Sequence, residues 1–354
     1  MNTINKWRLS LSAVVLIICL VLGGCDVHEF PQLGEPAPLK LKLNFNTELP
    51  PFLTVNYGTK QEDIPSLYDI RYQIKAYLIT KNDEYDRLET ASFTYTAPVT
   101  DNLNYETTLT LPSGEFMFKV WADYVRKGTQ EDLYHNTENF NNIKLTEPHT
   151  ANTDFRDGFC GSKVIKVENT KIDGVVSEDV IEMERPLAKF IFITTDLKEF
   201  IDKETKTKLK ELMKAGRTST WAEDSTKAVE VKPEDYYLVF KYPIYMPCAY
   251  SIFEDRPVNS KPGVEFKSVM VPLSGNEATL GFDYVLVNGK ESSAQVAVEL
   301  YNKKGEILSN SGTIDVPLKR SKLTEVRGAF LTLETGGGVG INPDFNGDHN
   351  IFIP

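Results

Sequence analysis

The stretch "LKLKLNF", residues 39–45, alternates apolar and polar side chains without a break. Successive side chains of a β-strand point to opposite faces of the sheet, so a period of two gathers the apolar ones on one face. These apolar residues are Leu39, Leu41, Leu43 and Phe45. The stretch therefore predicts a strand that buries one face in a core and exposes the other to water.

Similar patterns continue through the first half of the chain. In "YDIRYQIKAYLIT", residues 68–80, one face would carry Ile70, Tyr72, Ile74, Ala76 and Leu78. "YETTLTLPSGEFMFKVWADYV", residues 105–125, holds two alternating runs joined at residues 112–114, Pro-Ser-Gly, which predicts a β-hairpin. Residues 126–160 are polar, rich in Asn and broken by Gly and Pro. We expect a long connection there with short strands at most, and such connections are often functional.

Short β-runs separated by turns fill most of the second half of the chain. They begin within "DVIEMERPLAKFIFITTD", residues 179–196, and continue over residues 236–334. Turns are expected at residues 274–276, 288–290, 304–306 and 310–312. Many short strands at regular intervals are typical of a β-sandwich. We therefore predict an all-β fold of two β-sandwich domains, residues 39–180 and residues 181–354.

One helix interrupts the second β-rich region, in "LKEFIDKETKTKLKELMKAG", residues 197–216. Its apolar residues recur near the helical period and would form one stripe. The stripe consists of Leu197, Phe200, Ile201, Leu209, Leu212 and Met213. Gly216 stands where a left-handed residue commonly ends a helix. We expect a single helical insertion in the second domain.

Residues 1–24 have the features of a secretory signal. Lys6 and Arg8 form a basic start, a short apolar run follows, and "LGGC" ends at Cys25. This tetrapeptide resembles the lipobox of bacterial lipoproteins, which implies cleavage before Cys25 and acylation of its thiol and amine. The alternative is an ordinary signal peptide in which the cysteine is incidental. Residues 25–38 contain three prolines and no apolar period, so we expect a tether.

Charge and cysteine content narrow the class of protein. The formal net charge is −11, and it would become −13 on removal of residues 1–24, which hold two basic residues and no acidic one. An acidic chain lacks the basic face that nucleic acids require, so we expect no nucleic-acid partner. An exported protein could form a disulfide between Cys160 and Cys248, but two free thiols are the other alternative and the one we expect.

No motif for catalysis or metal binding emerges from the sequence. Its four histidines are His28, His135, His149 and His349, and none lies in a nucleophile elbow or at zinc-ligand spacing. They are expected to be surface loop residues. We predict that the protein is not an enzyme and has no catalytic residue, cofactor or metal ion.

The stretch "GGGVGINPDFNGDHNIFIP", residues 336–354, could hold a phosphate, a calcium ion or a set of turns. In a dinucleotide fingerprint the third glycine would fall on Ile341 or Pro343, so that interpretation fails. In a calcium loop that begins at Asp344, glycine stands at the fourth position instead of the sixth. Turns at Pro-Asp and Asn-Gly followed by a short final strand remain.

Four stretches together resemble the fimbrillin-like lipoproteins of Bacteroidetes, which include pilus subunits and the lipoproteins that anchor them. The stretches are "LPSGEFMFKVWADYV", "ERPLAKFIFITTD", "VPLKRSKLTEVRGAFLT" and the glycine-rich residues 336–354. The resemblance covers residues 39–354 and is closest to a short, anchor-sized branch of mostly unassigned function. It implies two transthyretin-like β-sandwiches, a lipid anchor in the outer membrane at the cell surface, fimbrial partner subunits and no catalysis.

The resemblance also implies assembly by β-strand donation, in which a neighbour's sheet edge accepts an extra strand. The donor candidate is residues 341–354, and the alternative is that this segment closes its own domain. The candidate donor or closing residues are Ile341, Phe345, Ile351, Phe352 and Ile353. Polymerising fimbrillins are trimmed after a basic residue, whereas here the first arginine beyond Cys25 is Arg71, within an expected strand. This departure favours an anchor or a stand-alone surface lipoprotein over a stalk subunit.

A surface glycan-binding lipoprotein is the rival interpretation. Exposed aromatic rings could stack on sugars, although aromatic residues more often fill sandwich cores. The candidate rings are Trp221, Tyr236, Tyr237, Tyr242 and Tyr245. Two or three coplanar exposed rings would favour glycan binding.

Overall fold

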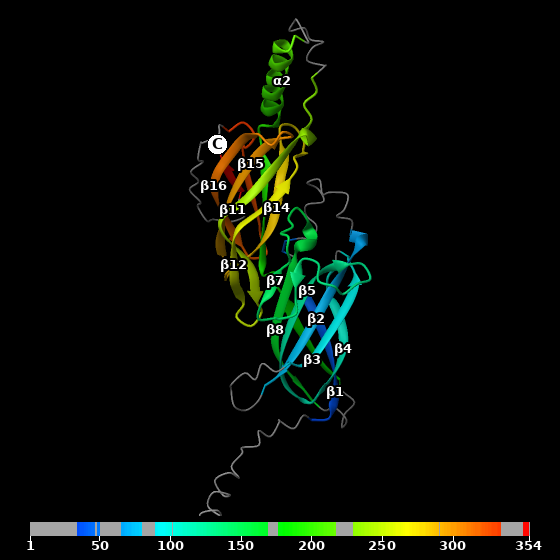
Figure 1. Cartoon of the computed structure of the whole chain (residues 1–354). Helices are drawn as coiled ribbons and strands as arrows, with labels where there is room; N and C mark the ends of the chain where they lie inside the picture. Colours follow the sequence, from blue (N-terminus) through cyan, green and yellow to red (C-terminus); the bar gives the residue numbers. More distant parts are fainter. Residues whose placement is uncertain are drawn as a thin grey trace, which may run out of the picture.

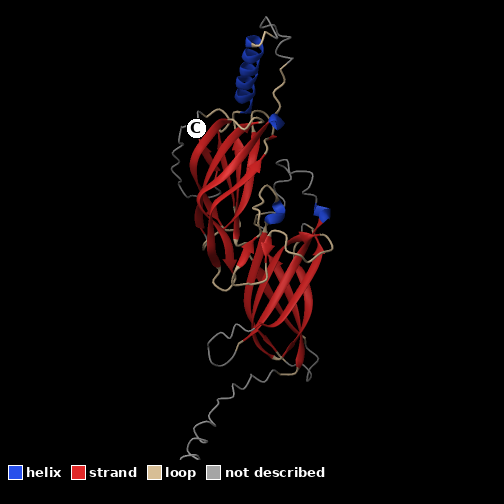
Figure 2. Ribbon diagram, in the orientation of Figure 1, coloured by secondary structure: helices blue, strands red, loops and turns tan. Residues whose placement is uncertain are grey.

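The computed structural model describes residues 34–46, 48–49, 65–79, 89–100, 102–168, 176–216, 229–289, 291–333 and 350–353. Strands dominate this part of the chain, and one α-helix accompanies them (Figure 2). Two β-sandwiches follow one another along the long axis of the molecule (Figure 1). The prediction of an all-β fold with a single helix is confirmed.

The first sandwich packs a three-stranded sheet, ordered β4-β1-β9, on a four-stranded sheet, ordered β3-β2-β5-β8. Its strands are β1 (Pro36–Phe45), β2 (Tyr68–Leu78), β3 (Glu89–Pro98), β4 (Tyr105–Pro112), β5 (Gly114–Arg126), β8 (Gly158–Val167) and β9 (Ser177–Met183). In β1, burial alternates along the strand as the sequence predicts, and Leu39, Leu41 and Leu43 are fully buried. The alternating faces of both sheets therefore build one core between them.

The hairpin predicted at residues 112–114 is wrong. β4 pairs with β1, whereas β5 pairs with β2 and β8 in the other sheet. Leu111 of β4 and Phe116 of β5 thus reach the same core from opposite sheets. The sequence pattern specifies which face of each strand is buried. It does not specify whether two strands joined by a turn pair within one sheet or lie in two sheets that face each other across the core, because both arrangements bury the same face of each strand.

The second sandwich also has two sheets, ordered β13-β14-β10-β17-β18 and β16-β15-β11-β7-β6, with β12 paired to β11. Its strands are β6 (His135–Asn136), β7 (Ile143–Leu145), β10 (Leu187–Thr194), β11 (Tyr236–Ser251), β12 (Arg256–Ser268), β13 (Val271–Pro272), β14 (Ala278–Leu286), β15 (Glu291–Asn302), β16 (Ile307–Lys319), β17 (Leu323–Gly328) and β18 (Asn350–Ile353). Every residue of β10 is buried, because this strand lies between β14 and β17 and is covered on both faces.

The turn predicted at residues 310–312 is wrong as well. These residues lie inside β16, where the pairing with β15 shifts register between Ala297 and Glu299. Gly312 has φ +66, and the Ser311 hydroxyl accepts a hydrogen bond from the Val298 backbone N–H. The Asn-Ser-Gly sequence therefore forms a β-bulge, which uses the same left-handed glycine as a turn does.

Helix α2 (Leu197–Lys214) projects beyond the second sandwich (Figure 1). Its first turn buries Leu197 and Phe200 against the core, while Met213 near its distal end is half-buried. Gly216 has φ +67 and donates its N–H to the Met213 carbonyl at 3.1 Å. The predicted helix and its glycine C-terminus are thus confirmed.

The connection between β5 and β8 lies between the two sandwiches. It contains β6 (His135–Asn136), β7 (Ile143–Leu145) and the 3-10 helix η3 (Asp154–Arg156), and β7 pairs with β11 of the second sandwich. Two other 3-10 turns are η2 (Pro65–Leu67) and η4 (Pro233–Asp235). The division predicted between residues 180 and 181 falls inside β9, which pairs with β1 along its whole length, so the two domain ranges stay a prediction.

A separate apolar cluster joins the two sandwiches. Trp121 of β5 and Cys160 of β8 pack with Ile191 of β10, Tyr250 of β11 and Phe282 of β14. All of these side chains are buried. Burial of this extent favours a fixed arrangement of the two sandwiches.

Candidate functional site

The segment predicted to be either a donated or a closing strand forms β18 (Asn350–Ile353), which lies on a sheet edge of its own chain. β18 pairs in parallel with β17, from Glu325 opposite Asn350 to Gly328 opposite Ile353. It is the outermost strand of its sheet among the described residues. β18 therefore covers backbone groups of β17 that would otherwise form an open edge.

The other predicted residues of this segment divide into two groups. Ile351, Phe352 and Ile353 belong to β18. Ile341 and Phe345 lie outside the described residues, as does the predicted lipidation site Cys25.

A pocket of about 500 Å³ opens beside the connection between the sandwiches. Its wall is formed by Tyr68 and Arg126 of the first sandwich and by residues 132–134, 146–148 and 150–153 of the connection. The guanidinium of Arg126 lies 4.8 Å from the centre of the Tyr68 ring, a distance typical of a cation–π contact. The pocket thus combines an aromatic base with charged and hydroxyl-bearing side chains.

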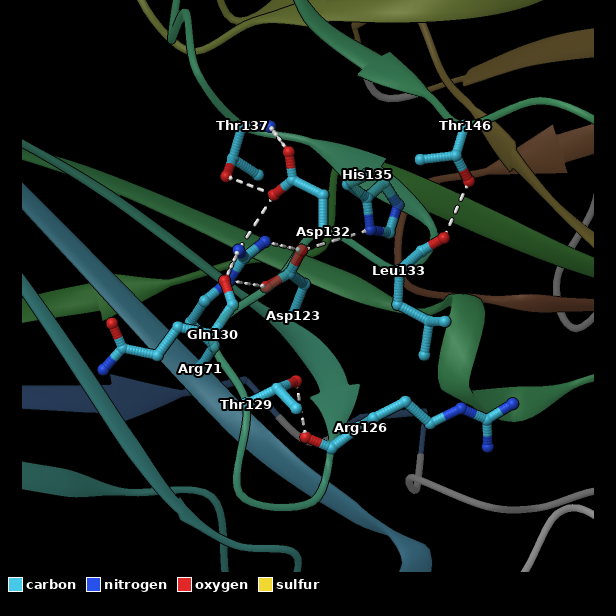
Figure 3. Close-up of polar contacts among 10 residues, drawn as sticks. All are labelled: Arg71, Asp123, Arg126, Thr129, Gln130, Asp132, Leu133, His135, Thr137 and Thr146. Carbon is cyan, nitrogen blue, oxygen red and sulfur yellow. Dashed lines mark hydrogen bonds and ion pairs between the residues drawn. The ribbon is translucent and has the colours of Figure 1, made fainter.

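Behind this pocket, a buried ion pair fastens the connection to the first sandwich (Figure 3). Arg71 of β2 donates from Nε and Nη2 to the two carboxylate oxygens of Asp123 on β5, each at 2.9 Å. Its Nη1 reaches the Gln130 carbonyl at 2.7 Å and Asp132 Oδ1 at 2.8 Å. Asp132 also accepts from the hydroxyl of Thr137. The Arg71 guanidinium therefore joins β2 to β5 and to the start of the loop at residues 130–137, and Asp132 in turn joins that start to Thr137 at the end of the loop.

The environment of Asp123 favours its charged form. Burial by itself would raise the pKa of this carboxyl, but the neighbouring His135 ring and the Arg71 guanidinium outweigh burial and lower the pKa. His135 Nδ1 lies 3.6 Å from Asp123 Oδ2, too far for a hydrogen bond, and its ring packs edge-on against Trp121. This arrangement positions the loop and places no nucleophile next to a base.

A second set of buried charges lies between the sandwiches, around η3. Lys189 Nζ is 2.5 Å from Asp154 Oδ1, and Arg185 Nε is 2.6 Å from Asp157 Oδ2. Arg156 forms an ion pair with Asp283. Three acidic and three basic side chains thus neutralise one another where water is excluded.

Tyrosine hydroxyls and one histidine complete this set. Tyr284 donates to Asp154 Oδ1 at 2.7 Å, and Tyr242 donates to Asp283 Oδ2 at 2.6 Å. His149 Nε2 lies 2.9 Å from the same oxygen of Asp283. The sequence patterns did not predict this network. Lys189 within an apolar run was the one signal for it, because a charge in a buried strand needs a partner.

The prediction that the histidines are surface loop residues is wrong for two of them. His135 is 1% exposed, and the side chain of His149 is 9% exposed against Asp283. Both lie in the connection that the sequence pattern marked as polar. Because that connection is covered by both sandwiches, its polar side chains are buried with partners instead of facing water. His28 and His349 lie outside the described residues.

The predicted sugar-stacking rings do not form a flat exposed platform in the described part of the chain. Tyr236 and Tyr242 are core residues, and Trp221 lies outside the described residues. Tyr237 stacks face to face on Tyr301, with centroids 5.1 Å apart. Of the four candidates that the structure describes, Tyr245 is the ring with a large exposed fraction, 63%.

Cys160 and Cys248 are free thiols, the alternative that we expected. Within the described ranges, no three His, Cys, Asp or Glu side chains are grouped as metal ligands would be. The same part of the chain contains no apolar helix of bilayer-spanning length.

Several solved structures are similar to this chain. The fimbrial anchor protein Mfa2 from Porphyromonas gingivalis shares 12% identity over 77% of this chain and 82% of its own, with a TM-score of 0.38. The tip fimbrial protein Mfa3 from the same organism shares 10% identity over 80% and 81%, with a TM-score of 0.35. A candidate polysaccharide-binding protein from Bacteroides thetaiotaomicron shares 12% identity over 77% and 79%, with a TM-score of 0.42. Fimbrial proteins, the class that the sequence resembles, are thus among the similar structures.

Sequence comparisons give one match and one negative result. A comparison with curated proteins finds no match. The model of a family of unknown function, DUF6562, matches residues 34–354, which include all the residues that the structure describes. The chain therefore belongs to the family of unknown function DUF6562.

Proposed function

We propose that this protein is a lipid-anchored lipoprotein of the outer membrane, of fimbrillin type, with a structural or adhesive role at the cell surface. In this proposal it joins fimbrial subunits by exchange of β18. The observation that carries the proposal is the parallel pairing of β18 with β17 over four residues at a sheet edge.

This pairing suits exchange for two physical reasons. Four residues give few ladder hydrogen bonds, so a longer strand from a neighbour could compete for the edge of β17. Residues 334–349 separate β18 from the packed part of the second sandwich, and at roughly 3.3 Å per extended residue they are long enough to carry β18 to another molecule. The same edge could then donate or accept a strand.

A disulfide between β17 and β18, which would prevent β18 from leaving its own sheet, tests the exchange. Val326 and Ile351 are register partners, so the variant Val326→Cys/Ile351→Cys would link β18 to its own sheet when oxidised. We expect the oxidised variant to lose association with fimbrial subunits and to regain it on reduction. Ile351→Cys alone, treated in the same way, is the matched control. Association that survives oxidation would mean that β18 closes its own sandwich and is not exchanged.

The lipid anchor rests on Cys25 and is tested separately. A Cys25→Ala protein should leave the membrane fraction and appear in the soluble fraction, because the proposed acyl chains would be absent. Retention in the membrane fraction would contradict the anchor. Protease treatment of intact cells would then report whether the second sandwich faces the exterior.

Glycan binding is the second candidate function, and the pocket beside the connection favours it. A volume of about 500 Å³ suits a small ligand, and Arg126, Asp132 and Asn152 offer hydrogen-bonding groups for hydroxyls. A glycan array on the intact protein, repeated with Arg126→Ala, tests this role. Binding that is lost in the variant supports it, and an array without binding removes it.

A further inference from the structure

The pair formed by Lys189 and Asp154 differs from the other ion pairs of the network. The amine Nζ lies 2.5 Å from Asp154 Oδ1, and the two side chains are 1% and 2% exposed. Arg185 and Arg156 are paired with carboxylates nearby, but a guanidinium does not lose its proton in proteins. Of the three basic side chains in these ion pairs, Lys189 is therefore the one that can become a neutral amine and act as a nucleophile.

The surroundings of this pair favour a neutral amine on Lys189 and an electron-poor carboxyl carbon on Asp154. The rings of Phe282 and Tyr284 lie 4.5 Å and 5.1 Å from Lys189 Nζ, at cation–π distance, and shield it from water. Burial lowers the pKa of Lys189, although the nearby Asp154 opposes this effect, so burial favours the neutral amine. The Tyr284 hydroxyl donates to Asp154 Oδ1 at 2.7 Å and draws electron density from the carboxyl carbon.

We propose that Lys189 and Asp154 form an intramolecular isopeptide bond. A proton passes from the Lys189 ammonium to the Asp154 carboxylate, and the neutral amine attacks Cγ. The tetrahedral intermediate loses one carboxyl oxygen as water, which leaves with two protons from the original ammonium. An amide between Nζ and Cγ remains. No oxidant, reductant or other reactant is consumed.

The buried environment also favours the product. Two charges held away from water carry a large desolvation penalty, and the reaction replaces them with a neutral amide. Once the released water has left, bulk water has little access to this buried site, so hydrolysis of the amide would be slow. The bond would join η3 of the connection to β10 of the second sandwich, across a sequence separation of 35 residues.

The chain provides an internal control for the effect of burial. Lys163 Nζ lies 2.5 Å from Asp179 Oδ1, the same distance, but these side chains are 44% and 29% exposed. Water stabilises the charged forms of that pair and competes for the carboxyl. We expect no isopeptide bond between Lys163 and Asp179.

Mass spectrometry of a tryptic digest of the full chain tests the proposal directly. We expect a branched peptide that joins residues 145–156 to residues 172–198, lighter by one water than the two peptides together, with no cleavage after Lys189. Cleavage after Lys163 should be normal. Linear peptides alone, with normal cleavage after Lys189, would show an ordinary ion pair and overturn the proposal.

Two variants strengthen this test. Asp154→Asn should give the same branched product with loss of ammonia in place of water, because the amine then displaces an amide nitrogen. Lys189→Arg preserves a positive charge but cannot form the bond, so its digest should contain linear peptides only. The wild-type digest decides the question even if neither variant folds.

Discussion

Arg71 and Asp123 face each other directly on the neighbouring strands β2 and β5 and share two hydrogen bonds of 2.9 Å. Both side chains are buried on the face of the sheet that the connection covers. The pair therefore links the first sandwich to the loop that carries the pocket wall. We therefore expect the loop at residues 130–137 to keep its position only while this ion pair is formed.

Loss of this pair should destabilise the protein. Asp123→Asn leaves the Arg71 guanidinium buried without its main counterion, a change that typically costs about 3–5 kcal/mol. Asp132 still contacts Arg71, so we expect a value near the lower end, about 3 kcal/mol. Urea unfolding followed by tryptophan fluorescence measures it. The exposed pair Lys166 and Glu168 serves as the control, and Lys166→Ala should leave the unfolding midpoint unchanged.

Acid should weaken the junction between the sandwiches through Asp283. Burial alone would raise the pKa of this carboxyl, but the neighbouring Arg156 and His149 outweigh burial and hold the pKa below the ordinary value of 3.8. A lowered pKa means that the ionised group stabilises the fold above pH 3.8, and that this contribution is lost as the pH falls through the lower folded-state value.

The variant Asp283→Asn, whose side chain cannot ionise, tests whether Asp283 causes this loss of stability in acid. It should be less stable than the wild type at pH 7, and its stability should depend less steeply on pH in the acid range. Urea midpoints measured at several pH values from neutral to acid check this. Parallel curves for the two proteins would show that Asp283 does not contribute to the acid dependence.

Close approach of β8 and β9 should make Gly161 intolerant of a side chain. A Cβ atom at this position would lie 2.7 Å from the Glu182 carbonyl oxygen and equally close to Ile181 and Met183. A backbone carbonyl within a sheet cannot move aside easily, so Gly161→Ala should cost about 1–3 kcal/mol. The exposed neighbour Ser162→Ala is the control. Equal thermal midpoints for the two variants would contradict this close packing.

The two free thiols should differ in reactivity. Burial raises the pKa of the Cys160 thiol to about 12, so it is protonated and inaccessible at neutral pH. Cys248 is half-buried, and burial also raises its pKa. A maleimide should therefore label Cys248 slowly in the folded protein and Cys160 only after unfolding. Peptide mapping locates the label, and early labelling of Cys160 would disprove its burial in the cluster between the sandwiches.

Local patterns in the sequence determined the faces and ends of individual elements. The alternation in residues 39–45 predicted the buried face of β1, and the apolar stripe and Gly216 predicted α2. These features depend on neighbours within a few positions along the chain. These local features would therefore be the same in any fold that contains these strands and this helix.

The partners of those elements were decided only by the tertiary structure. Backbone hydrogen bonds are alike for every strand, so the pattern in β4 and β5 left open whether they pair or face each other across a core. The burial of His135 and the pairing of Lys189 with Asp154 depend on segments far apart in sequence. A charge can remain in a core only where the fold brings its counterion within reach, and that distance is set by the packing of the two sandwiches on the connection between them.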